Sequence, residues 1–411
     1  MNSGRIVIVG GGAAGFFAAI ACTEAGFTGE IVVLEKTSQF LSKVKISGGG
    51  RCNVTHALFN AREFTARYPR GERALIAPFK QYQALDTVKW FTERGVKLKT
   101  EKDGRMFPIT DSSQTIIDCL LNATRRSGVI LKTNHGVERV TKKSDGGFEL
   151  TLSTGETMPC DKLLLATGGC RTPALGAIAE SLGHTLEPPV PSLFTFHIAV
   201  PWLRQLAGIS VDTVEVSVAE TKLRERGALL ITHWGLSGPA VLRLSAWGAR
   251  ELHKKDYRFS LHINWLPNHS EEDLNKEFQT RRASQPARFI VNSPITPLSA
   301  RLWEQLVLAA GIARDTRWSA LSRSAQHQLV QQLLRTEFPV TGKSLNKDEF
   351  VTCGGVRLPE VDFKTMESKL CPGLFFAGEL LDIDGVTGGF NFQAAWTTGW
   401  IAGKSMAQTK P

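Results

Sequence analysis

The first strongly apolar stretch of the chain is a short strand that runs into glycines. Residues 5–9 read Arg-Ile-Val-Ile-Val, and small and apolar residues continue from Ala13 to about Ala25. A strand of β-branched residues, a glycine turn and a small-residue helix are typical of the βαβ unit that binds dinucleotides. A second apolar strand over 31–34 ends at Glu35 and completes the unit.

The glycines of this turn follow the pattern G-x-G-x-x-G at Gly10, Gly12 and Gly15. The first glycine permits the tight turn, the second lets the main chain approach a pyrophosphate, and the third brings the helix close to the strand. Free N–H groups at the start of the helix, around Ala13 and Ala14, would stabilise the phosphate charge.

Glu35 lies 20 residues after Gly15, where an acid accepts hydrogen bonds from the hydroxyls of an adenosine ribose. Its charge would repel a ribose 2′-phosphate, so the pattern predicts FAD or NAD and not NADP. The alternative interpretation is a structural glycine turn with a surface glutamate.

A second glycine-rich segment spans residues 40–56, and its glycines and polar groups predict a loop. Three consecutive glycines, Gly48 to Gly50, would let the main chain lie flat against a planar ring or a phosphate, while Arg51 and Asn53 offer donors. The residues alone leave two interpretations open, a cofactor loop or a surface turn with a buried Cys52.

A further apolar strand in the first half of the chain also ends in a glycine turn. It starts at residue 162 and runs into Thr167, Gly168 and Gly169. Such a turn, downstream of a dinucleotide unit, suits the crevice at the carboxyl ends of a parallel sheet.

The C-terminal segment also has a pattern typical of dinucleotide binding, a strand followed by glycines and a helix. An apolar strand over 373–379 ends in Gly-Glu, and Gly388 and Gly389 precede a helix expected over about 392–408. The N-terminus of that helix would face a developing anion, which in flavoproteins is the N1/C2 carbonyl edge of the reduced ring.

The middle of the chain follows other patterns. The prolines of 187–191 predict a domain boundary, alternating runs at 214–218 and 257–263 predict an antiparallel sheet or barrel, and 270–338 has a helical pattern. His233 lies in a loop between the alternating runs, where it either faces a substrate or has a structural role.

Composition narrows the class of protein. The content of 42% hydrophobic and 21% charged residues is that of a soluble globular chain, and no signal peptide or membrane-length apolar window is present, so we expect a cytoplasmic protein with no membrane partner. Seven scattered cysteines without a C-x-x-C pair argue against disulfides, a metal site and a dithiol reductase.

The formal net charge of +10 favours a polyanionic partner such as RNA, but charge alone does not establish one, and a solvated basic surface is the default interpretation. A basic cluster at Arg281, Arg282 and Arg288 fits a solvated helix face better than an RNA contact.

Six segments carry specific motifs: Gly-Gly-Gly-Ala-Ala-Gly at 10–15, Ser-Gly-Gly-Gly-Arg-Cys-Asn at 47–53, Gly-Arg-Met-Phe-Pro at 104–108, Thr-His-Trp-Gly-Leu-Ser-Gly-Pro at 232–239, Thr-Met-Glu-Ser-Lys at 365–369, and the run from Ala377 to Asn391. Together they resemble the BaiN/YhiN-type bacterial flavoproteins, from residue 5 to about 405. The resemblance favours FAD over NAD and places 48–53 in the FAD site.

The resemblance also implies the fold class and the domains. The fold would be α/β, with a Rossmann-like FAD-binding domain of the two-dinucleotide-binding-domain flavoprotein type, an inserted antiparallel β-barrel domain and a small helical domain. The FAD-binding domain would comprise 1–191 plus 350–411, the barrel-like domain 192–268 and the helical domain 269–349.

We therefore predict one set of cofactor-binding residues from the motifs and the resemblance. The set is Gly10, Gly12, Ala13, Ala14, Gly15, Glu35, Lys36, Gly49, Gly50, Arg51, Cys52, Asn53, Val137, Thr167, Gly168, Gly169, Gly378, Glu379, Asp384, Gly388, Gly389, Phe390 and Asn391.

The function implied by the resemblance is the reduction of a C=C bond conjugated to a carbonyl, with hydride transfer from flavin N5. The substrate would be a ribosomal RNA uracil or a small-molecule enone. Arg105 and His233 are the predicted donors to the enolate oxygen, and Cys52 is a weaker candidate proton source. Since the sequence has one G-x-G-x-x-G unit, NAD(P)H would visit the flavin transiently. The alternative function is a FAD-binding, RNA-associated factor without turnover of its own.

Overall fold

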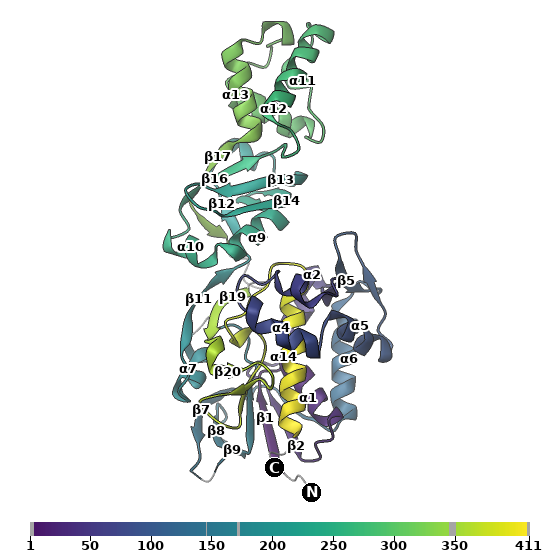
Figure 1. The fold of residues 1–411 in the computed structure, drawn as a ribbon, viewed down its shortest axis with the longest axis vertical. Helices are drawn as coiled ribbons and strands as arrows, with labels where there is room; N and C mark the ends of the chain where they lie inside the picture. Colours follow the sequence, from purple (N-terminus) through teal and green to yellow (C-terminus); the bar gives the residue numbers. More distant parts are fainter. Residues whose placement is uncertain (1–3, 145, 171–172, 345–350, 409–411) are drawn as a thin grey trace. The chain divides into compact units, whose positions relative to one another are not determined.

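The computed structural model describes residues 4–144, 146–170, 173–344 and 351–408. The chain divides into two compact units, Met1–Ser192 with Asn346–Pro411, and Leu193–Leu345 (Figure 1). The first break lies one residue beyond the predicted boundary at 191/192. The second predicted boundary, at 349/350, lies outside the described residues.

The first unit is built on a seven-stranded sheet. In spatial order its strands are β20 (Val361–Asp362), β21 (Glu367–Ser368), β22 (Leu374–Phe376), β10 (Lys162–Leu165), β1 (Arg5–Val9), β2 (Glu30–Leu34) and β6 (Ile130–Lys132). The five strands from β22 to β6 are parallel, and β20 and β21 form an antiparallel edge. The predicted α/β, Rossmann-like class is therefore confirmed.

Two antiparallel three-stranded sheets and one strand pair complete the β-structure of this unit. The sheets are β7 (Val137–Lys142), β8 (Phe148–Leu152) and β9 (Thr157–Cys160), and β3 (Thr55–His56), β5 (Arg105–Pro108) and β4 (Leu98–Thr100); the pair is β11 (Leu186–Ser192) with β19 (Val351–Val356). The helices are α1 (Ala13–Glu24), α2 (Ser42–Gly50), α3 (Ala61–Thr65), α4 (Glu72–Gln81), α5 (Ala84–Glu93), α6 (Ser113–Arg126), α7 (Pro173–Ser181) and α14 (Phe390–Ala407), with 3-10 turns at Leu358–Glu360 and Gly378–Leu380.

Helices α1 and α14 lie side by side although they come from opposite ends of the chain (Figure 1). A Cβ on Gly399 would lie 2.4 Å from the carbonyl oxygen of Ala14, and one on Gly403 would lie 2.2 Å from that of Ala18. The absence of side chains at these two positions allows the close approach, and the matching order of the contacts shows that the helices run in the same direction.

The predicted loop over 40–56 is partly helical. Residues from Ser42 follow a helix until Ser47, where ψ is 149°, and Gly48 and Gly49 then have φ values of 56° and 67°. The loop prediction was wrong for the stretch before Ser47, because Val44 packs into the apolar core and pulls a helical turn onto it. The consecutive glycines end the helix, as their left-handed conformations require.

The second unit contains a seven-stranded antiparallel sheet, which confirms the predicted strand type. Its order is β17 (Thr336–Val340), β16 (Phe259–Asn264), β13 (Ser210–Val218), β14 (Arg224–Thr232), β15 (Gly235–Ser237), β12 (Thr195–His197) and β18 (Gly342–Ser344). One residue, Thr341, connects the two edge strands. Since neighbouring strands lie about 4.8 Å apart, the sheet must curl until its edges approach, as in a barrel.

The helices of the second unit are α8 (Pro201–Arg204), α9 (Pro239–Trp247), α10 (Ala249–Lys254), α11 (Glu271–Ser284), α12 (Ala300–Ala309) and α13 (Arg323–Leu334), with 3-10 turns at Ile290–Asn292 and Trp318–Ala320. The helical segment predicted over 269–349 differs from the structure at its end. Residues from Thr336 onward form β17 and β18, because Thr336, Phe338 and Val340 alternate as buried positions and complete the sheet.

Candidate cofactor-binding site

The turn between β1 and α1 has the geometry that the glycine pattern predicts. Gly10 has a φ of 116°, and a Cβ there would lie 2.2 Å from the carbonyl oxygen of Ala166. A Cβ on Gly15 would lie 2.1 Å from the carbonyl oxygen of Gly10, whereas one on Gly12 would meet no atom within 4 Å. Two glycines thus serve close packing, and Gly12 faces open space.

The N-terminus of α1 has no side-chain cap. Gly12 is the N-cap residue, and its carbonyl accepts the first helical hydrogen bond from Phe16 N–H at 3.1 Å. The N–H groups before Phe16, including those of Ala13 and Ala14, therefore remain available at the positive end of the helix dipole. This arrangement suits an anion such as a pyrophosphate.

Glu35 follows β2 directly and is held in place by its neighbours. Its Oε2 accepts from Gly11 N–H at 3.0 Å, and its Oε1 accepts from Thr37 N–H at 2.9 Å. Main-chain hydrogen bonding from His135 to the Glu35 carbonyl, at 2.9 Å, brings the start of β7 beside it. The half-buried Val137 and the exposed Lys36 lie in this neighbourhood, as expected for residues around an adenosine.

Glu379 joins three separate segments at the carboxyl end of the parallel sheet. Its carboxylate accepts from Lys43 Nζ at 2.5 Å and from Thr352 N–H at 2.8 Å. A Cβ on Gly169 would lie 2.9 Å from Glu379 Oε1, and one on Gly168 would lie 3.8 Å from Lys43 Nζ. The Ala-Thr-Gly-Gly turn and the Gly-Glu turn therefore meet, as the sequence predicts for a parallel sheet.

Two hydroxyls at this junction are buried without a hydrogen-bond partner among the described residues, Thr167 Oγ1 and Thr352 Oγ1. A buried hydroxyl without a partner costs about 1–3 kcal/mol, so native proteins rarely leave one unpaired. Both oxygens are enclosed in the ligand-free chain, so the open space at Gly12 is the feature of this region that fits a polar ligand.

A second uncapped helix N-terminus belongs to α14. Gly388 and Gly389 have φ values of 133° and 93°, and Gly389, the N-cap residue, provides no side chain to cap the helix. Asn391 closes the preceding turn, since its amide bonds both the N–H and the carbonyl of Gly385 at 2.8 Å. Gly378, in the neighbouring Gly-Glu turn, donates to Thr398 Oγ1 at 2.9 Å.

The two helix N-termini are staggered along a common direction. Gly399 lies against Ala14, and Gly403 lies against Ala18. Ala14 is one residue after the start of α1, whereas Gly399 is nine residues after the start of α14, so α14 extends eight residues further at its N-terminal end. At 1.5 Å per residue this stagger is about 12 Å. The first unit therefore presents two uncapped, parallel helix ends that are separated along one line.

Asp384, a predicted cofactor contact, has a different role. Its side chain is 0% exposed and forms an ion pair with Arg70, and it accepts from Ser192 Oγ at 2.6 Å. Burial raises the pKa of this carboxyl, opposed by the charge of Arg70. Since no surface of Asp384 is open in the ligand-free chain, its burial argues against the predicted cofactor contact, and its observed role is to anchor the segment before α14.

The structure also argues against Cys52 as a cofactor contact and as a proton source. The residue is 0% exposed and belongs to the apolar cluster beneath α2. Burial raises the pKa of its thiol to about 12. The enclosed side chain of Cys52 packs under the glycine segment. For this residue the structure agrees with the alternative interpretation, in which Cys52 is buried beneath the turn.

Arg51 and Arg105 share one carboxylate. Arg51 Nη1 donates to Glu101 at 2.7 Å, and Arg105 Nη2 donates to the other oxygen of Glu101 at 3.0 Å. Arg105 also donates to Asp103 at 2.7 Å, while the Arg51 guanidinium lies 4.0 Å above the ring of Phe107. Both side chains are half-exposed and engaged, so Arg105 would have to exchange a partner to reach a substrate.

His233 belongs to the second unit, whereas Arg105 belongs to the first. Its side chain is exposed at the turn between β14 and β15. The indole N–H of the neighbouring Trp234 is buried without a described partner. The role of His233 as a donor to substrate stays a prediction.

The basic cluster of the helical segment is largely engaged with the main chain. Arg281 donates to the carbonyl of Ser293, and Arg282 donates to that of Leu321 at 2.6 Å. Arg288 donates to the carbonyl of Asn292 at 3.0 Å. These guanidinium groups hold the loops of the helical segment.

Two residues of the 40–56 segment, Lys43 and His56, lie at the candidate site although the sequence predicted no role for them. Lys43 pairs with Glu379, and His56 Nδ1 lies 3.0 Å from the carbonyl oxygen of Gly388. Both lie inside the 40–56 segment that the sequence had marked, but a lone lysine and a lone histidine carry no spacing signal. Only the fold brings their distant partners to them.

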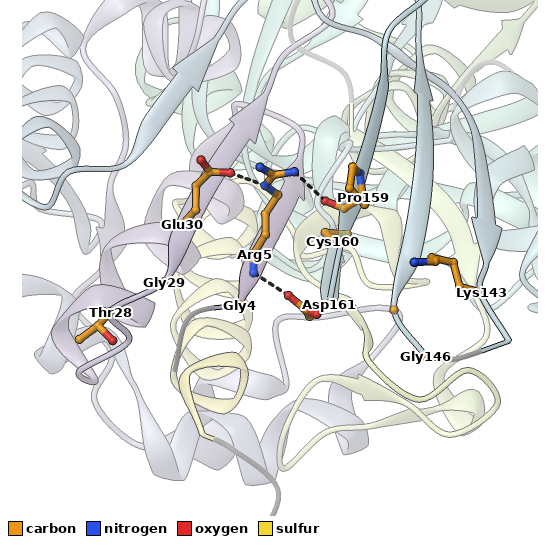
Figure 2. Close-up of a pocket in the computed structure, with 11 residues that line it drawn as sticks. Gly4, Arg5, Thr28, Gly29, Glu30, Lys143, Gly146, Pro159, Cys160 and Asp161 are labelled. Carbon is orange, nitrogen blue, oxygen red and sulfur yellow. Dashed lines mark hydrogen bonds and ion pairs between the residues drawn. The ribbon is translucent and has the colours of Figure 1, made fainter. Parts of the chain in front are cut away.

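A cavity of about 820 Å³ lies at the opposite end of the parallel sheet (Figure 2). Arg5 is one of the residues that line the cavity (Figure 2). Its guanidinium pairs with Glu30 and donates to the carbonyl of Pro159, and its main-chain N–H donates to Asp161 (Figure 2). The cavity lies at the amino ends of β1 and β2. Ligands of open α/β sheets bind outside the carboxyl ends, so this is not the cofactor site.

A chain of hydrogen bonds joins Ser368, His184 and Glu360 in the order of a hydrolase triad. The distances are 2.8 Å from Ser368 Oγ to His184 Nε2 and 3.0 Å from His184 Nδ1 to Glu360. However, Ser368 Oγ also accepts from the N–H groups of Leu370 and Cys371, at 3.0 and 2.7 Å, and is buried. With its lone pairs occupied, this serine is a structural link and not a nucleophile.

These features define the class of the protein, a flavoprotein oxidoreductase with a Rossmann-like FAD-binding fold and an inserted second unit. The chain belongs to the HI0933-like family: the family described as HI0933-like protein Rossmann domain matches residues 4–405. The resemblance found in the motifs is therefore confirmed.

Named relatives cover almost the whole chain. It is 32% identical to a ribosomal RNA dihydrouridine synthase of Escherichia coli (strain K12), over 98% of each chain. It is 29% identical to a 3-dehydro-bile acid delta(4,6)-reductase of Clostridium scindens, over 98% of this chain and 99% of the relative.

Solved structures with low sequence identity share the fold. A 3-ketosteroid-delta4-(5alpha)-dehydrogenase of Rhodococcus jostii RHA1 is 14% identical, with a TM-score of 0.52 over 99% of this chain and 97% of that chain. A 3-ketosteroid delta1-dehydrogenase of Sterolibacterium denitrificans is 13% identical, with a TM-score of 0.52 over 99% and 100%.

The described part of the chain contains neither a membrane-spanning helix nor a metal-binding cluster of side chains. None of its helices is long and apolar enough to cross a membrane. Within the same residues, no group of three or more His, Cys, Asp or Glu side chains is arranged to hold a metal ion.

Proposed function

We propose that the chain is a FAD-dependent reductase of C=C bonds conjugated to a carbonyl group. The observation that carries this proposal is the pair of uncapped helix N-termini at Gly12 and Gly389, parallel and staggered by about 12 Å. The end of α1 suits a pyrophosphate, and the end of α14 suits the electron-rich edge of an isoalloxazine ring. One extended dinucleotide can engage both.

The residues along this line fit FAD. Gly12 leaves room for the pyrophosphate, and Glu35 is oriented to accept from ribose hydroxyls. Glu379, whose side chain is 18% exposed, lies at the junction of the Ala-Thr-Gly-Gly and Gly-Glu turns, where it could accept from a polyol chain. The cofactor would thus pass from α1 across the carboxyl ends of β1 and β10 to α14.

Bound FAD would supply a hydride from N5 to the β-carbon of the conjugated double bond. The chain itself contributes electrostatics. The N-terminus of α14 stabilises negative charge at the ring edge by up to about 2 kcal/mol. A donor at the enolate oxygen would contribute about 3 kcal/mol, and we keep Arg105 and His233 as the candidates for that role.

For the substrate we propose a uracil base within RNA, whose C5–C6 double bond is conjugated to the C4 carbonyl. Two observations support this choice over a small enone: the net charge of +10, and the naming of relatives from Escherichia coli and Haemophilus influenzae as ribosomal RNA dihydrouridine synthases, at 32% and 30% identity. A basic protein attracts RNA without regard to sequence. The bile-acid relative keeps a small-molecule enone as the second candidate.

We further propose that NADH or NADPH reduces the flavin in a transient encounter. The chain has a single G-x-G-x-x-G turn, and that turn leads into α1. A nicotinamide dinucleotide would therefore share the flavin cleft and leave before substrate enters.

The test is an anaerobic two-step experiment on the purified full-length protein. The flavin is reduced with NADH or NADPH, and its reoxidation is followed by stopped flow after addition of unmodified ribosomal RNA or of an unsaturated 3-oxo steroid. Reoxidation by RNA, with dihydrouridine in the product, is the expected result. Reoxidation by the steroid alone would select the small enone.

Absence of reoxidation by either substrate, with FAD bound and RNA retained, would contradict the enzyme proposal and favour a FAD-binding RNA factor. RNA affinity should fall steeply with salt if phosphates carry the binding. RNA that already contains the reduced base is the control, since it has no double bond to accept the hydride.

A further inference from the structure

We propose that His56 is a positioning residue that fixes the glycine turn before α14 and thereby tunes the reduction potential of the bound flavin. The identity of the cofactor rests on the proposed function, whereas the contacts of His56 are features of the protein itself. His56 would act through the Gly388–Gly389 peptide and not by touching the substrate.

The first contact is a hydrogen bond to the turn. His56 Nδ1 lies 3.0 Å from the carbonyl oxygen of Gly388. A carbonyl only accepts, so Nδ1 carries the proton and donates. The other ring nitrogen lies against the main chain of Gly104, where a Cβ would come within 2.5 Å of Nε2. The imidazole is therefore held on both sides.

The second contact is a hydrogen bond between Asn53 and the N–H of the Gly388–Gly389 peptide. With its amide oriented so that both groups are satisfied, Asn53 accepts from Gly389 N–H at 2.9 Å and donates to the carbonyl of Thr55 at 3.1 Å. His56 and Asn53 thus hold the carbonyl and the N–H of one peptide unit. A rotation of that peptide would break both hydrogen bonds.

The first turn of α14 is held as well. The His56 ring stacks on Phe390, with centroids 4.7 Å apart and planes 26° apart. Tyr68 donates its hydroxyl proton to the carbonyl of Phe390 at 2.5 Å. The segment that carries His56 therefore clamps both the glycine turn and the residue that begins the helix.

Such a clamp is needed because Gly388 and Gly389 both adopt left-handed φ values. Two adjacent glycines have the largest conformational freedom of any pair. Gly389 packs against the main chain of Thr55, and the hydrogen bonds of His56 and Asn53 fix the orientation of the peptide between the two glycines. The dipoles of this turn and the free N–H groups behind it face the proposed ring edge. When these dipoles and N–H groups are already held in position, the chain spends no free energy on reorienting them as the flavin is reduced, so they stabilise the reduced ring more strongly.

The test compares His56→Ala and His56→Asn with the wild type. The amide nitrogen of Asn can occupy the position of Nδ1 and donate to Gly388, whereas Ala cannot. His262→Ala, a half-buried histidine of β16 in the second unit, is the matched control for loss of an imidazole. All variants are prepared as the full-length chain.

The first measurement needs no cofactor. In the flavin-free protein, hydrogen exchange at 388–393 should accelerate at least fivefold in His56→Ala and stay near the wild-type rate in His56→Asn and His262→Ala. Equal exchange in His56→Ala and the wild type would overturn the clamp, whatever ligand the site takes.

The second measurement is the midpoint potential of the flavin-loaded protein. His56→Ala should shift the equilibrium about tenfold toward the oxidised flavin, which is about 30 mV for a two-electron couple. His56→Asn should recover most of the shift. An unchanged potential in His56→Ala, or a shift of equal size in His56→Asn, would overturn the tuning role. A wild-type chain that binds no flavin would refute the proposed function, while the exchange measurement would still decide the clamp.

Discussion

The two glycine turns of the first unit are built in different ways. At Gly10 and Gly15 the neighbours are main-chain atoms, the carbonyl oxygens of Ala166 and of Gly10 itself. The second turn is mixed: a Cβ on Gly389 would also meet main chain, that of Thr55 at 2.6 Å, whereas one on Gly388 would meet the side chains of Phe390 and His56, at 2.9 and 3.4 Å. The hydrogen bond from His56, 332 positions earlier in the sequence, to the Gly388 carbonyl can be removed by one substitution, whereas contacts with main chain cannot.

The largest expected effect concerns the stability of the first turn. Gly10→Ala should lower the free energy of unfolding by about 3 kcal/mol or more, because its Cβ would collide with the main chain at Ala166 and its φ of 116° is strained for alanine. Gly12→Ala should change stability by less than about 0.5 kcal/mol, since its Cβ meets nothing. Urea unfolding of the flavin-free proteins measures both, and equal midpoints would contradict the comparison.

The next largest effect is expected on stability when the Arg70–Asp384 ion pair, which anchors the segment before the Gly388–Gly389 turn, is broken. Asp384→Asn should cost about 3 kcal/mol, because it removes the buried negative charge that pairs with Arg70. A double variant, Arg70→Met with Asp384→Leu, should recover much of the loss, because it removes both charges. If the double variant were as unstable as the single one, the ion pair would not be the source of the effect.

A smaller effect is expected on cofactor binding at the first turn. Gly12→Ala should weaken FAD binding about 30-fold, or about 2 kcal/mol, because the added methyl group occupies the space left for the pyrophosphate. Flavin fluorescence titration gives the affinity. Gly342→Ala in the second unit is the control, since its Cβ also meets no atom within 4 Å.

The smallest expected effect is the pH dependence of the second turn. Burial lowers the pKa of His56 below its ordinary value of 6.5, so the unfolded chain binds a proton more readily than the folded one. Stability should therefore fall as the pH drops below about 6.5, by at most about 1.4 kcal/mol per pH unit for this group. His184 contributes in the same direction, because burial also lowers its pKa.

His56→Asn removes one of these two groups. Its unfolding free energy should depend less on pH between about 5 and 6.5 than that of the wild type, as measured by urea unfolding at a series of pH values. An unchanged slope would show that His56 keeps an ordinary pKa in the folded protein.

The sequence predicted the first turn almost completely. The strand 5–9, the spacing of Gly10, Gly12 and Gly15, and the acid at the end of the next strand lie within 35 residues, and local propensity and periodicity determine such units. The class of fold followed from this unit and from the motifs at the C-terminus.

The two predicted site residues that the structure argues against share one physical feature. Asp384 and Cys52 lie inside motifs that carry the resemblance, yet both are 0% exposed. A motif shows that a residue type belongs at a position but not whether its side chain faces the ligand or the core, because burial depends on segments elsewhere in the chain. Arg70 and Ser192, which enclose Asp384, had no signal in the sequence.

The sequence by itself determined a strand, glycine turn and helix near the N-terminus, in the pattern typical of dinucleotide binding, and the glycines that precede a helix near the C-terminus. The tertiary structure decided how these ends meet. Gly399 and Gly403 let α14 pack directly on α1 and set the stagger of the two helix ends, while Asn53 and His56 hold the second turn. Such contacts join residues more than 300 positions apart, so they follow from packing and hydrogen bonding in the folded chain and not from local pattern.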